Sequence, residues 1–378
     1  MLKTETKNPQ GIQQQGENAP ATKKTKWTTA ARKAGNTKQI RYVRVGADGR
    51  PEPTIDYMDH APVHPVYLHT DGLFRPVPNS KSEPRLAVEK YYRADKVYLH
   101  CKWRGKHALN IFDQSVLMFL CQLAAQPSRA FHVCADDEKA AVLMRSLNAE
   151  GLGSDFIHIG IKTTLPEVVR GIGLSATGTN STAVLESLNR LAATRMRRTK
   201  ANADGSRSDV TGTTNLLGLV CGDDAQSIVL NTELSNACRR IGAVAWVNMR
   251  EQRLIKSKPA KRLHAWLSNW ASSRETRAVD LKLLHKHIWG DQPCTASATK
   301  SRSHTLRASI QEISQHTGWV CFVDEDKKRL MVRKPIFAGT KAATAATPTI
   351  LAETASTTAE RETEESSKSS TGVALQTV

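Results

Sequence analysis

One arrangement of short segments occurs twice in this chain and constrains its fold more than any other feature. Each copy has two helix-like segments separated by a turn, then strand-like residues that flank a charged loop; the copies span residues 165 to about 220 and 279 to about 332. In the second copy Leu306, Ile310 and Ile313 recur at intervals of four and three residues, which places them on one face of a helix. Two helices followed by a β-hairpin are the outline of a winged helix, whose second helix can enter the major groove of DNA. The pattern therefore predicts an α+β chain with two tandem winged-helix domains.

The net charge of the chain favours an anionic partner. The sequence has 54 Lys and Arg residues against 36 Asp and Glu residues, a formal net charge of +18. Nucleic acid is the commonest partner of so basic a chain. An acidic membrane surface is the competing partner, but no apolar run approaches the roughly 20 residues that span a bilayer, and no long basic amphipathic helix with exposed aromatic residues stands out. We therefore expect double-stranded DNA as the partner and no membrane association.

Both ends of the chain lack the apolar periodicity of a folded domain. Residues 1–58 are rich in Gln, Lys, Thr, Asn and Gly, and residues 339–378 consist mostly of Ala, Thr, Ser and Glu. Such segments bury too little apolar surface to offset the entropy lost on ordering, so we expect a disordered basic tail and a disordered acidic tail. The predicted winged-helix domains between the tails are residues 59–222 and 223–338.

The cysteine usage indicates a reducing compartment. The seven cysteines are scattered and include no C-x-x-C pair, so neither a zinc site nor a disulfide framework is expected. The N-terminus also lacks the charged-then-apolar pattern of a signal peptide. Together these features predict a cytoplasmic protein.

The first predicted domain has three helix-like segments. Residues 111–125 are apolar enough for a largely buried helix, and residues 165–172 form the next one. Ser181 is the expected N-cap of the third helix. The hairpin that follows has its predicted tip at residues 203–206 and its returning strand at 215–220.

The second predicted domain opens with strand-like segments at residues 227–231 and 244–247. Residues 259–270 then have the spacing of an amphipathic helix, and residues 279–289 form the next helix. The helix around Leu306 and its hairpin complete the domain.

Four segments of the chain carry a resemblance to a known family. They are residues 71–75 (DGLFR), 258–267 (KPAKRLHAWL), 284–289 (LHKHIW) and the stretch 301–323. In this order they resemble the replication initiators of IncQ-type plasmids (the RepC type) and, more distantly, the TrfA-like initiators with tandem winged helices. The resemblance implies a protein that binds directly repeated origin sites (iterons), melts adjacent DNA and recruits a plasmid- or host-encoded replicative helicase. It implies no nuclease or ATPase centre, and it leaves a homodimer open.

Basic and polar residues gather on the second recognition helix and its wing. Cations at the N-terminal end of a helix oppose the helix dipole unless an anion binds there, which favours a DNA contact over a merely solvated face. Arg302 or Arg307 is the candidate for bidentate contact with guanine, worth about 1–3 kcal/mol of discrimination. The wing cations are expected to meet phosphate and to set the register. The residues expected to contact DNA in this module are Lys300, Arg302, Ser303, His304, Arg307 and Gln311 on the helix and Lys327, Lys328 and Arg329 on the wing.

The first module offers a smaller set of candidate DNA contacts. Arg197, Arg198 and Lys200 begin its predicted wing and are expected to contact phosphate. Ser181 has two interpretations, a helix cap and a DNA contact, of which the cap is favoured.

Enzymatic functions have little support in the sequence. No G-x-x-x-x-G-K-[ST] loop is present, so a helicase or ATPase is not indicated. His285 and His287 have the spacing of a rolling-circle nickase, but a lysine separates them and no tyrosine follows in the module. His60, His64 and His69 lie among prolines without a suitable acidic partner. We therefore expect no enzyme, no cofactor and no metal, with a winged-helix transcriptional regulator and a metal-dependent origin nickase as the alternatives.

Overall fold

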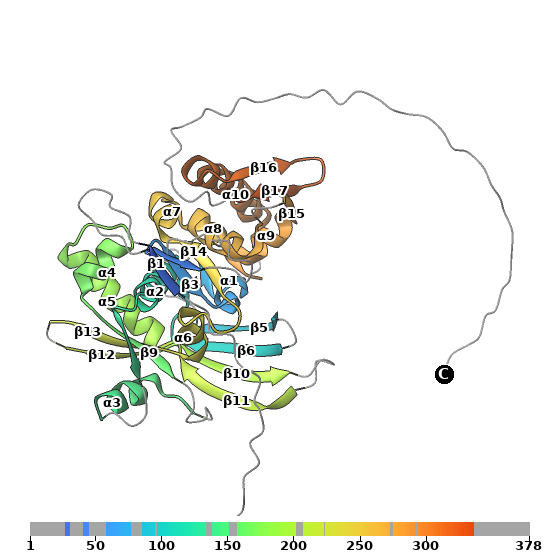
Figure 1. Ribbon diagram of the computed structural model, residues 1–378. Helices are drawn as coiled ribbons and strands as arrows, with labels where there is room; N and C mark the ends of the chain where they lie inside the picture. Colours follow the sequence, from blue (N-terminus) through green and yellow to red (C-terminus); the bar gives the residue numbers. More distant parts are fainter. Residues whose placement is uncertain are drawn as a thin grey trace, which may run out of the picture. The chain divides into compact units, whose positions relative to one another are not determined.

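The secondary structure is α+β within the part of the chain that can be described (Figure 1). A computed structural model of the protein describes residues 27–30, 41–44, 58–76, 85–94, 97–133, 138–150, 157–201, 207–222, 224–272, 275–291 and 294–335. The predicted C-terminal tail lies outside these residues, as does most of the N-terminal tail. Within the latter, where no element was predicted, β1 (Trp27–Ala30) pairs antiparallel with β2 (Arg41–Arg44).

Helix α2 (Ile111–Ala124) forms the centre of the larger hydrophobic core, and Phe112 is its one residue that is not buried. Its start is fixed by a reciprocal cap: the Asn110 side chain accepts the N–H groups of Phe112 and Asp113, and the Asp113 carboxylate accepts the N–H of Asn110. The predicted buried helix at 111–125 is therefore confirmed. The other helices of this part are α1 (Pro65–His69), α3 (Glu138–Leu147), α4 (Leu165–Gly171), α5 (Gly178–Ala192) and α6 (Thr232–Cys238).

Two four-stranded antiparallel sheets flank these helices. The first has the order β11-β10-β6-β5, drawn side by side in Figure 1, and the second has the order β12-β13-β9-β8. The strands of the first are β5 (Leu86–Ala94), β6 (Val97–Gly105), β10 (Arg195–Ala201) and β11 (Arg207–Asn215). Those of the second are β8 (Ala130–Val133), β9 (His158–Thr163), β12 (Leu217–Cys221) and β13 (Gln226–Leu230). Two shorter pairs join β3 (His60–Val63) to β14 (Ala245–Asn248) and β4 (Phe74–Arg75) to β7 (Leu109–Asn110).

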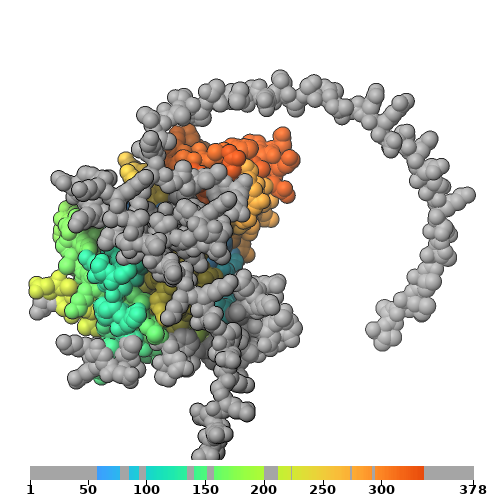
Figure 2. Space-filling view, in the orientation of Figure 1, coloured from blue at the N-terminus to red at the C-terminus, as the bar shows by residue number. Residues whose placement is uncertain are grey.

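The C-terminal part has its own hydrophobic cluster, which runs from Ile255 to Val332. Its elements are α7 (Met249–Leu254), α8 (Lys258–Trp270), β15 (Arg277–Asp280), α9 (Leu281–Trp289), α10 (Ala296–Thr317), β16 (Val320–Asp324) and β17 (Arg329–Arg333). Strand β17 lies between β15 and β16 in one small sheet. The predicted order of two helices and a hairpin in residues 279–332 is confirmed, except that 277–280 form a strand and Asp280 caps α9. Figure 2 shows the orange-red hairpin β16–β17 at the molecular surface.

The N-cap predicted for α5 is wrong. Helix α5 begins at Gly178, and its cap is Thr177, whose side-chain oxygen accepts the N–H of Asn180 at 3.3 Å. Ser181 instead lies inside the helix and is half-buried. The segment offers several residues that cap helices well, so composition alone does not select one of them.

The returning strand predicted at 215–220 is also wrong. The partner of β10 is β11, which ends at Asn215, and β12 belongs to the second sheet. Leu216 marks the change of sheet, because its N–H donates to the carbonyl of Thr194 at 2.9 Å. The predicted hairpin tip at 203–206 lies outside the described residues.

Two strands assigned from the sequence to the second domain pack with the first core. Strand β13 pairs with β12 and β9, and β14 pairs with β3. The buried side chains of Ile228, Leu230 and Val247 belong to the larger core. The predicted division after residue 222 thus falls between two strands of one sheet. The alternation of a strand predicts its buried face but does not identify its partner strand.

Candidate nucleic-acid interface

Helix α10 presents a polar face to solvent on the side opposite its buried residues. Leu306, Ile310 and Ile313 anchor the helix in the C-terminal cluster, as the sequence predicts. Four exposed residues follow one another at intervals of four, three and four, which places them on one stripe. These residues are Lys300, His304, Arg307 and Gln311, here called the open face of α10.

The predicted conflict between these cations and the helix dipole is not present. Helix α10 begins at Ala296, with Thr295 as its cap, so Lys300 lies beyond the first turn. The dipole acts mainly on charges within the first turn. The case for a DNA contact therefore depends on exposure and geometry rather than on the helix terminus.

Arg307 is held by an acidic residue of the hairpin. Its Nε and one terminal nitrogen donate to the two carboxylate oxygens of Glu325, at 3.0 and 2.8 Å. This hydrogen-bonded pair raises the pKa of Arg307 and lowers the pKa of Glu325. Both side chains are about half exposed, so water and phosphate have access to the pair. The guanidinium is thus oriented at the surface between helix and hairpin.

Two predicted contact residues lie on the packing side of α10 instead. The guanidinium carbon of Arg302 is 5.7 Å from the ring centre of Trp289, and Ser303 Oγ is 3.2 Å from His285 Nε2. Both Arg302 and Ser303 are half-buried. Burial, followed by the charges of Arg302 and Arg307, lowers the pKa of His285. This places Arg302 over an aromatic ring of α9, whereas Arg307 lies on the open face.

The hairpin carries the predicted wing cations together with equal acidic charge. Lys327, Lys328 and Arg329 are exposed. They follow three acidic residues, 324–326, and the Lys327 N–H donates to Asp324 at 3.1 Å. Lys328 has a left-handed backbone (φ 50°), and its carbonyl accepts the N–H of Leu281 at 3.0 Å. These bonds fix the turn, and the cationic side chains extend from it.

The corresponding helix of the first part, α5, differs in charge. Its exposed side chains are Thr179, Thr182, Glu186 and Asn189, and its sequence contains no lysine. Its one arginine, Arg190, donates to the Asp113 carboxylate at 2.8 Å, and Asp113 is 0% exposed. Ser187 Oγ donates to the same carboxylate at 2.6 Å. The cation of α5 is therefore used to attach it to α2.

The residues of the first module that were predicted to contact phosphate do not lie on one surface. Arg198 points inward to an ion pair with the buried Glu233, whereas Arg197 is exposed on the other face of β10. The side chain of Lys200 lies outside those that the structure describes. Strand alternation accounts for the separation. Lys102 and Arg104 of β6 were not predicted as contacts; they alternate with the buried Cys101 and Trp103.

Three of the segments behind the family resemblance meet at one buried junction. Arg262 is 0% exposed and donates to the carbonyls of Thr70 and His287, at 2.9 and 3.2 Å. The Asp71 carboxylate pairs with the His287 ring and, at 3.3 Å, with Lys90. Burial lowers the pKa of Arg262 to about 10. For Asp71, burial acts to raise the pKa, but the bonds to His287 and Lys90 outweigh it and lower the value.

The paired histidines considered for a nickase have different partners. His287 stacks on Trp266 with 4.5 Å between ring centres and pairs with Asp71, whereas His285 faces Ser303. Among the described residues no group of three or more His, Cys, Asp or Glu side chains is arranged to hold a metal ion. No described helix combines the length and the apolar content needed to cross a membrane.

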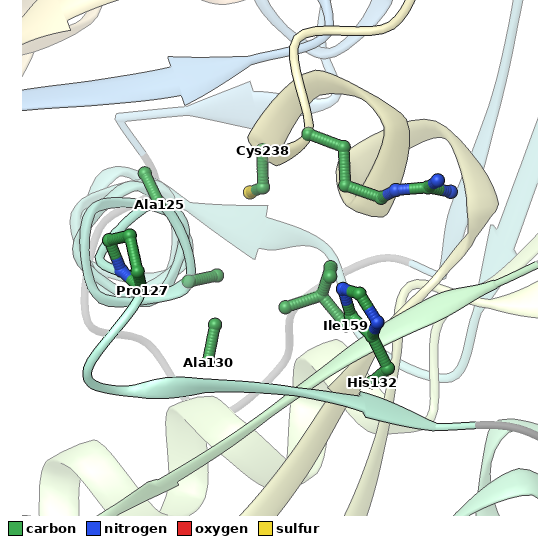
Figure 3. A pocket seen from close by; sticks show the side chains of 8 residues that line it. Ala125, Pro127, Ala130, His132, Ile159 and Cys238 are labelled. Atoms are coloured by element: carbon green, nitrogen blue, oxygen red, sulfur yellow. The ribbon is translucent and has the colours of Figure 1, made fainter. Parts of the chain in front are cut away.

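A hollow near the end of α2 has few reactive groups (Figure 3). His132 and Arg239 are the only ionisable nitrogen-bearing side chains in its lining, and the rest is small or apolar apart from the buried thiol of Cys238. The residues that line the hollow are Ala124, Ala125, Pro127, Ala130, His132, Ile159, Cys238 and Arg239. This lining contains no carboxylate.

Comparison with known proteins identifies one matching family and a set of similar solved structures that includes two of RctB domains. The sequence profile described as "Replication protein C (RepC)" matches residues 55–334. The chain is similar to a crystal structure of selenomethionine derivatives of domains 2 and 3 of RctB, at 10% identity and a TM-score of 0.45, over 72% of this chain and 99% of that one. A second crystal structure of RctB domains 2–3 matches at 10% identity and a TM-score of 0.39, over 71% and 94% of the two chains. No curated protein sequence matches.

Proposed function

The chain belongs to the replication protein C (RepC) family, and from that premise we propose that it initiates plasmid replication by binding directly repeated sites in duplex origin DNA. Opening of adjacent DNA and recruitment of a replicative helicase are part of the proposal. The protein performs these steps without a catalytic centre of its own.

The open face of α10 is the observation that carries the proposal. The helix is anchored by three buried residues and presents a stripe of cationic and amide side chains to solvent. The elements α8 to β17 follow the order of a winged helix, in which the helix before the hairpin enters the major groove. That groove is about 12 Å wide and admits one α-helix. Arg307 and Gln311 suit guanine and adenine edges respectively, whereas Lys300 suits phosphate.

The first part of the chain repeats the order of two helices and a hairpin in α4, α5, β10 and β11. We retain the tandem winged-helix arrangement as a proposal on this ground and assign base reading to α10 alone. The exposed Thr and Asn side chains of α5 can donate hydrogen bonds, but they supply no positive charge. Sequence-independent affinity for DNA comes mainly from cations that neutralise phosphates.

The proposal is tested by binding of the full-length chain to origin DNA. Fluorescence anisotropy at fixed salt compares a duplex with the origin repeat and a scrambled duplex of equal composition. We expect Arg307→Ala to reduce the preference for the repeat by about 5- to 150-fold, which corresponds to 1–3 kcal/mol. Arg250→Ala removes an exposed arginine from α7 and serves as the matched control. Equal losses on both duplexes would make Arg307 a phosphate contact.

Two further measurements separate the alternatives. Preference for promoter DNA over the origin repeat would identify a transcriptional regulator. Nicked product from supercoiled origin plasmid and Mg²⁺ would identify an endonuclease and overturn the assignment as a non-enzyme. We expect neither result.

A further inference from the structure

The outward face of the sheet β5–β6–β10–β11 has a block of four cations. Arg195 lies directly opposite Arg104, and Arg197 lies opposite Lys102, in the register of β10 with β6. The alternate residues Cys101, Trp103 and Met196 are buried in the core, so the cations lie on the other face. We call Lys102, Arg104, Arg195 and Arg197 the cationic sheet face.

This arrangement is unfavourable without an anion. Like charges directly opposite each other on neighbouring strands destabilise a sheet. Glu89 Oε2 lies 2.9 Å from Lys102 Nζ, and Glu150 Oε2 lies 2.5 Å from a terminal nitrogen of Arg195. These two ion pairs relieve part of the repulsion between the cations. Arg104 and Arg197 are exposed, and neither forms an ion pair with another residue among those described. The face therefore has charge available for a polyanion.

An aromatic ring lies beside the cations on the same face. Tyr91 is 56% exposed and is paired in register with His100, whose neighbour on β10 is Thr199. Its ring stacks flat on the imidazole of His100, with 4.1 Å between ring centres and 1° between planes. His100 is 1% exposed, so one face of the tyrosine ring packs on a buried imidazole, while the rest of the ring is open to solvent. An open ring next to cations is the arrangement on which unpaired bases stack.

We propose that the cationic sheet face and Tyr91 bind single-stranded DNA. A duplex keeps its bases stacked inside, so it would offer phosphates to the cations but no base to Tyr91. Residues two apart on a strand are about 6.6 Å apart, and neighbouring strands about 4.8 Å apart, so one extended strand can cross several of the cations. The proposal rests on the proposed function only for the source of the strand, which is the opened origin.

The test measures binding of the full-length protein to a labelled single strand of about 20 nucleotides without an origin repeat. For Arg104→Gln combined with Arg197→Gln we expect the dissociation constant to rise about tenfold. The slope of log affinity against log salt should fall by about 1.4, since each contact with a single strand contributes about 0.7. Arg250→Gln combined with Lys256→Gln removes the same charge from exposed sites elsewhere and should change affinity less than twofold.

Tyr91 provides the second arm of the experiment. Tyr91→Ala should weaken single-strand binding at least fivefold, and Tyr91→Phe, which keeps the ring, should change it less than twofold. Unchanged single-strand affinity in the Arg104/Arg197 variant would overturn the proposal. Equal losses on duplex without the repeat would also overturn it, as they would indicate a general phosphate surface. If the Arg104/Arg197 variant differs from the wild type in oligomeric mass in solution but not in affinity for the single strand, the face instead binds a second copy of the chain.

The two proposals fail in different ways. Binding of the wild-type chain to the repeat duplex reports on α10 and the proposed function. Single-strand binding of the Arg104/Arg197 and Tyr91 variants reports on the sheet face alone, because these residues lie on β5, β6 and β10.

Discussion

Helices α5 and α10 occupy the same place in the repeated pattern, yet each uses its arginine differently. Arg190 of α5 is bound to Asp113, which is wholly buried, whereas Arg307 of α10 is bound to Glu325 at the surface. Removing one member of a buried pair costs about 3–5 kcal/mol, because the groups left behind lose their hydrogen bonds and their compensating charge. An exposed pair contributes about 0–1 kcal/mol and can be exchanged for a phosphate or a base edge. In the proposed function, the location of the acidic partner therefore decides which of the two helices can bind DNA.

The largest effect should come from breaking the buried pair. Asp113→Ala removes the acceptor for Arg190, for Ser187 Oγ and for the N–H of Asn110. We expect the free energy of unfolding in urea to fall by about 3–5 kcal/mol. Glu325→Ala, the matched change at the exposed pair, should leave the free energy of unfolding nearly unchanged. Similar small losses for both variants would remove the distinction between the two helices.

A pH effect of comparable size should originate in the first part of the chain. Burial is the main cause that lowers the pKa of His64 from 6.5 to about 4, with Glu233 raising it and Arg198 lowering it further. The unfolded chain therefore binds this proton more readily than the folded chain. The contribution of His64 to the free energy of unfolding is fully present above pH 6.5 and is lost as the pH falls towards 4. The loss is about 3 kcal/mol, at 1.36 kcal/mol for each pKa unit.

His64→Asn tests the assignment of this pH effect. His64 accepts the N–H of Val66 at the start of α1, and asparagine also caps helices. Urea denaturation at pH 7 and pH 4.5 should show a smaller loss of stability for the variant than for the wild type. An unchanged pH dependence would assign the titration to another group.

The sequence predicts the features of the fold that depend on near neighbours. The spacing of Leu306, Ile310 and Ile313 identifies the buried side of α10, and the apolar run at 111–125 identifies α2. Partners distant in the chain are not encoded in such spacing. Neither the pairing of β13 with β9 nor the inward ion pair of Arg198 with Glu233 follows from local pattern.

The same limit applies to the candidate site. Arg302 and Arg307 are both arginines of α10, and the sequence does not distinguish them. In the structure Arg302 lies over the aromatic ring of Trp289 in the preceding helix. The strand register that brings Arg104 beside Arg195 joins residues about 90 positions apart. Alternation in β6 was the available signal for Lys102 and Arg104, and it becomes informative once the neighbouring strand is known.

The hairpin cations should affect DNA binding in general rather than specificity. Lys327→Ala combined with Lys328→Ala removes two exposed cations next to the open face of α10. We expect about tenfold weaker binding to repeat and scrambled duplexes alike. The salt slope should fall by about 1.8, at 0.9 for each lost phosphate contact. A slope equal to that of the wild type would exclude the hairpin from the interface.

The smallest effect should be a gain in affinity. Glu325→Gln removes the negative charge that holds Arg307 while keeping the size of the side chain. We expect affinity for any duplex to rise about two- to fivefold. A loss of affinity would show instead that the pair orients Arg307 for binding.

Methylation interference on a single origin repeat tests the difference between α5 and α10 most directly. Methylation at guanine N7 blocks contacts in the major groove, where an inserted helix reads bases. We predict interference confined to one major-groove segment of each repeat, with the effect at one guanine lost in Arg307→Ala. Two equally strong clusters about 10 base pairs apart would contradict this account, because α5 would then read bases as α10 does.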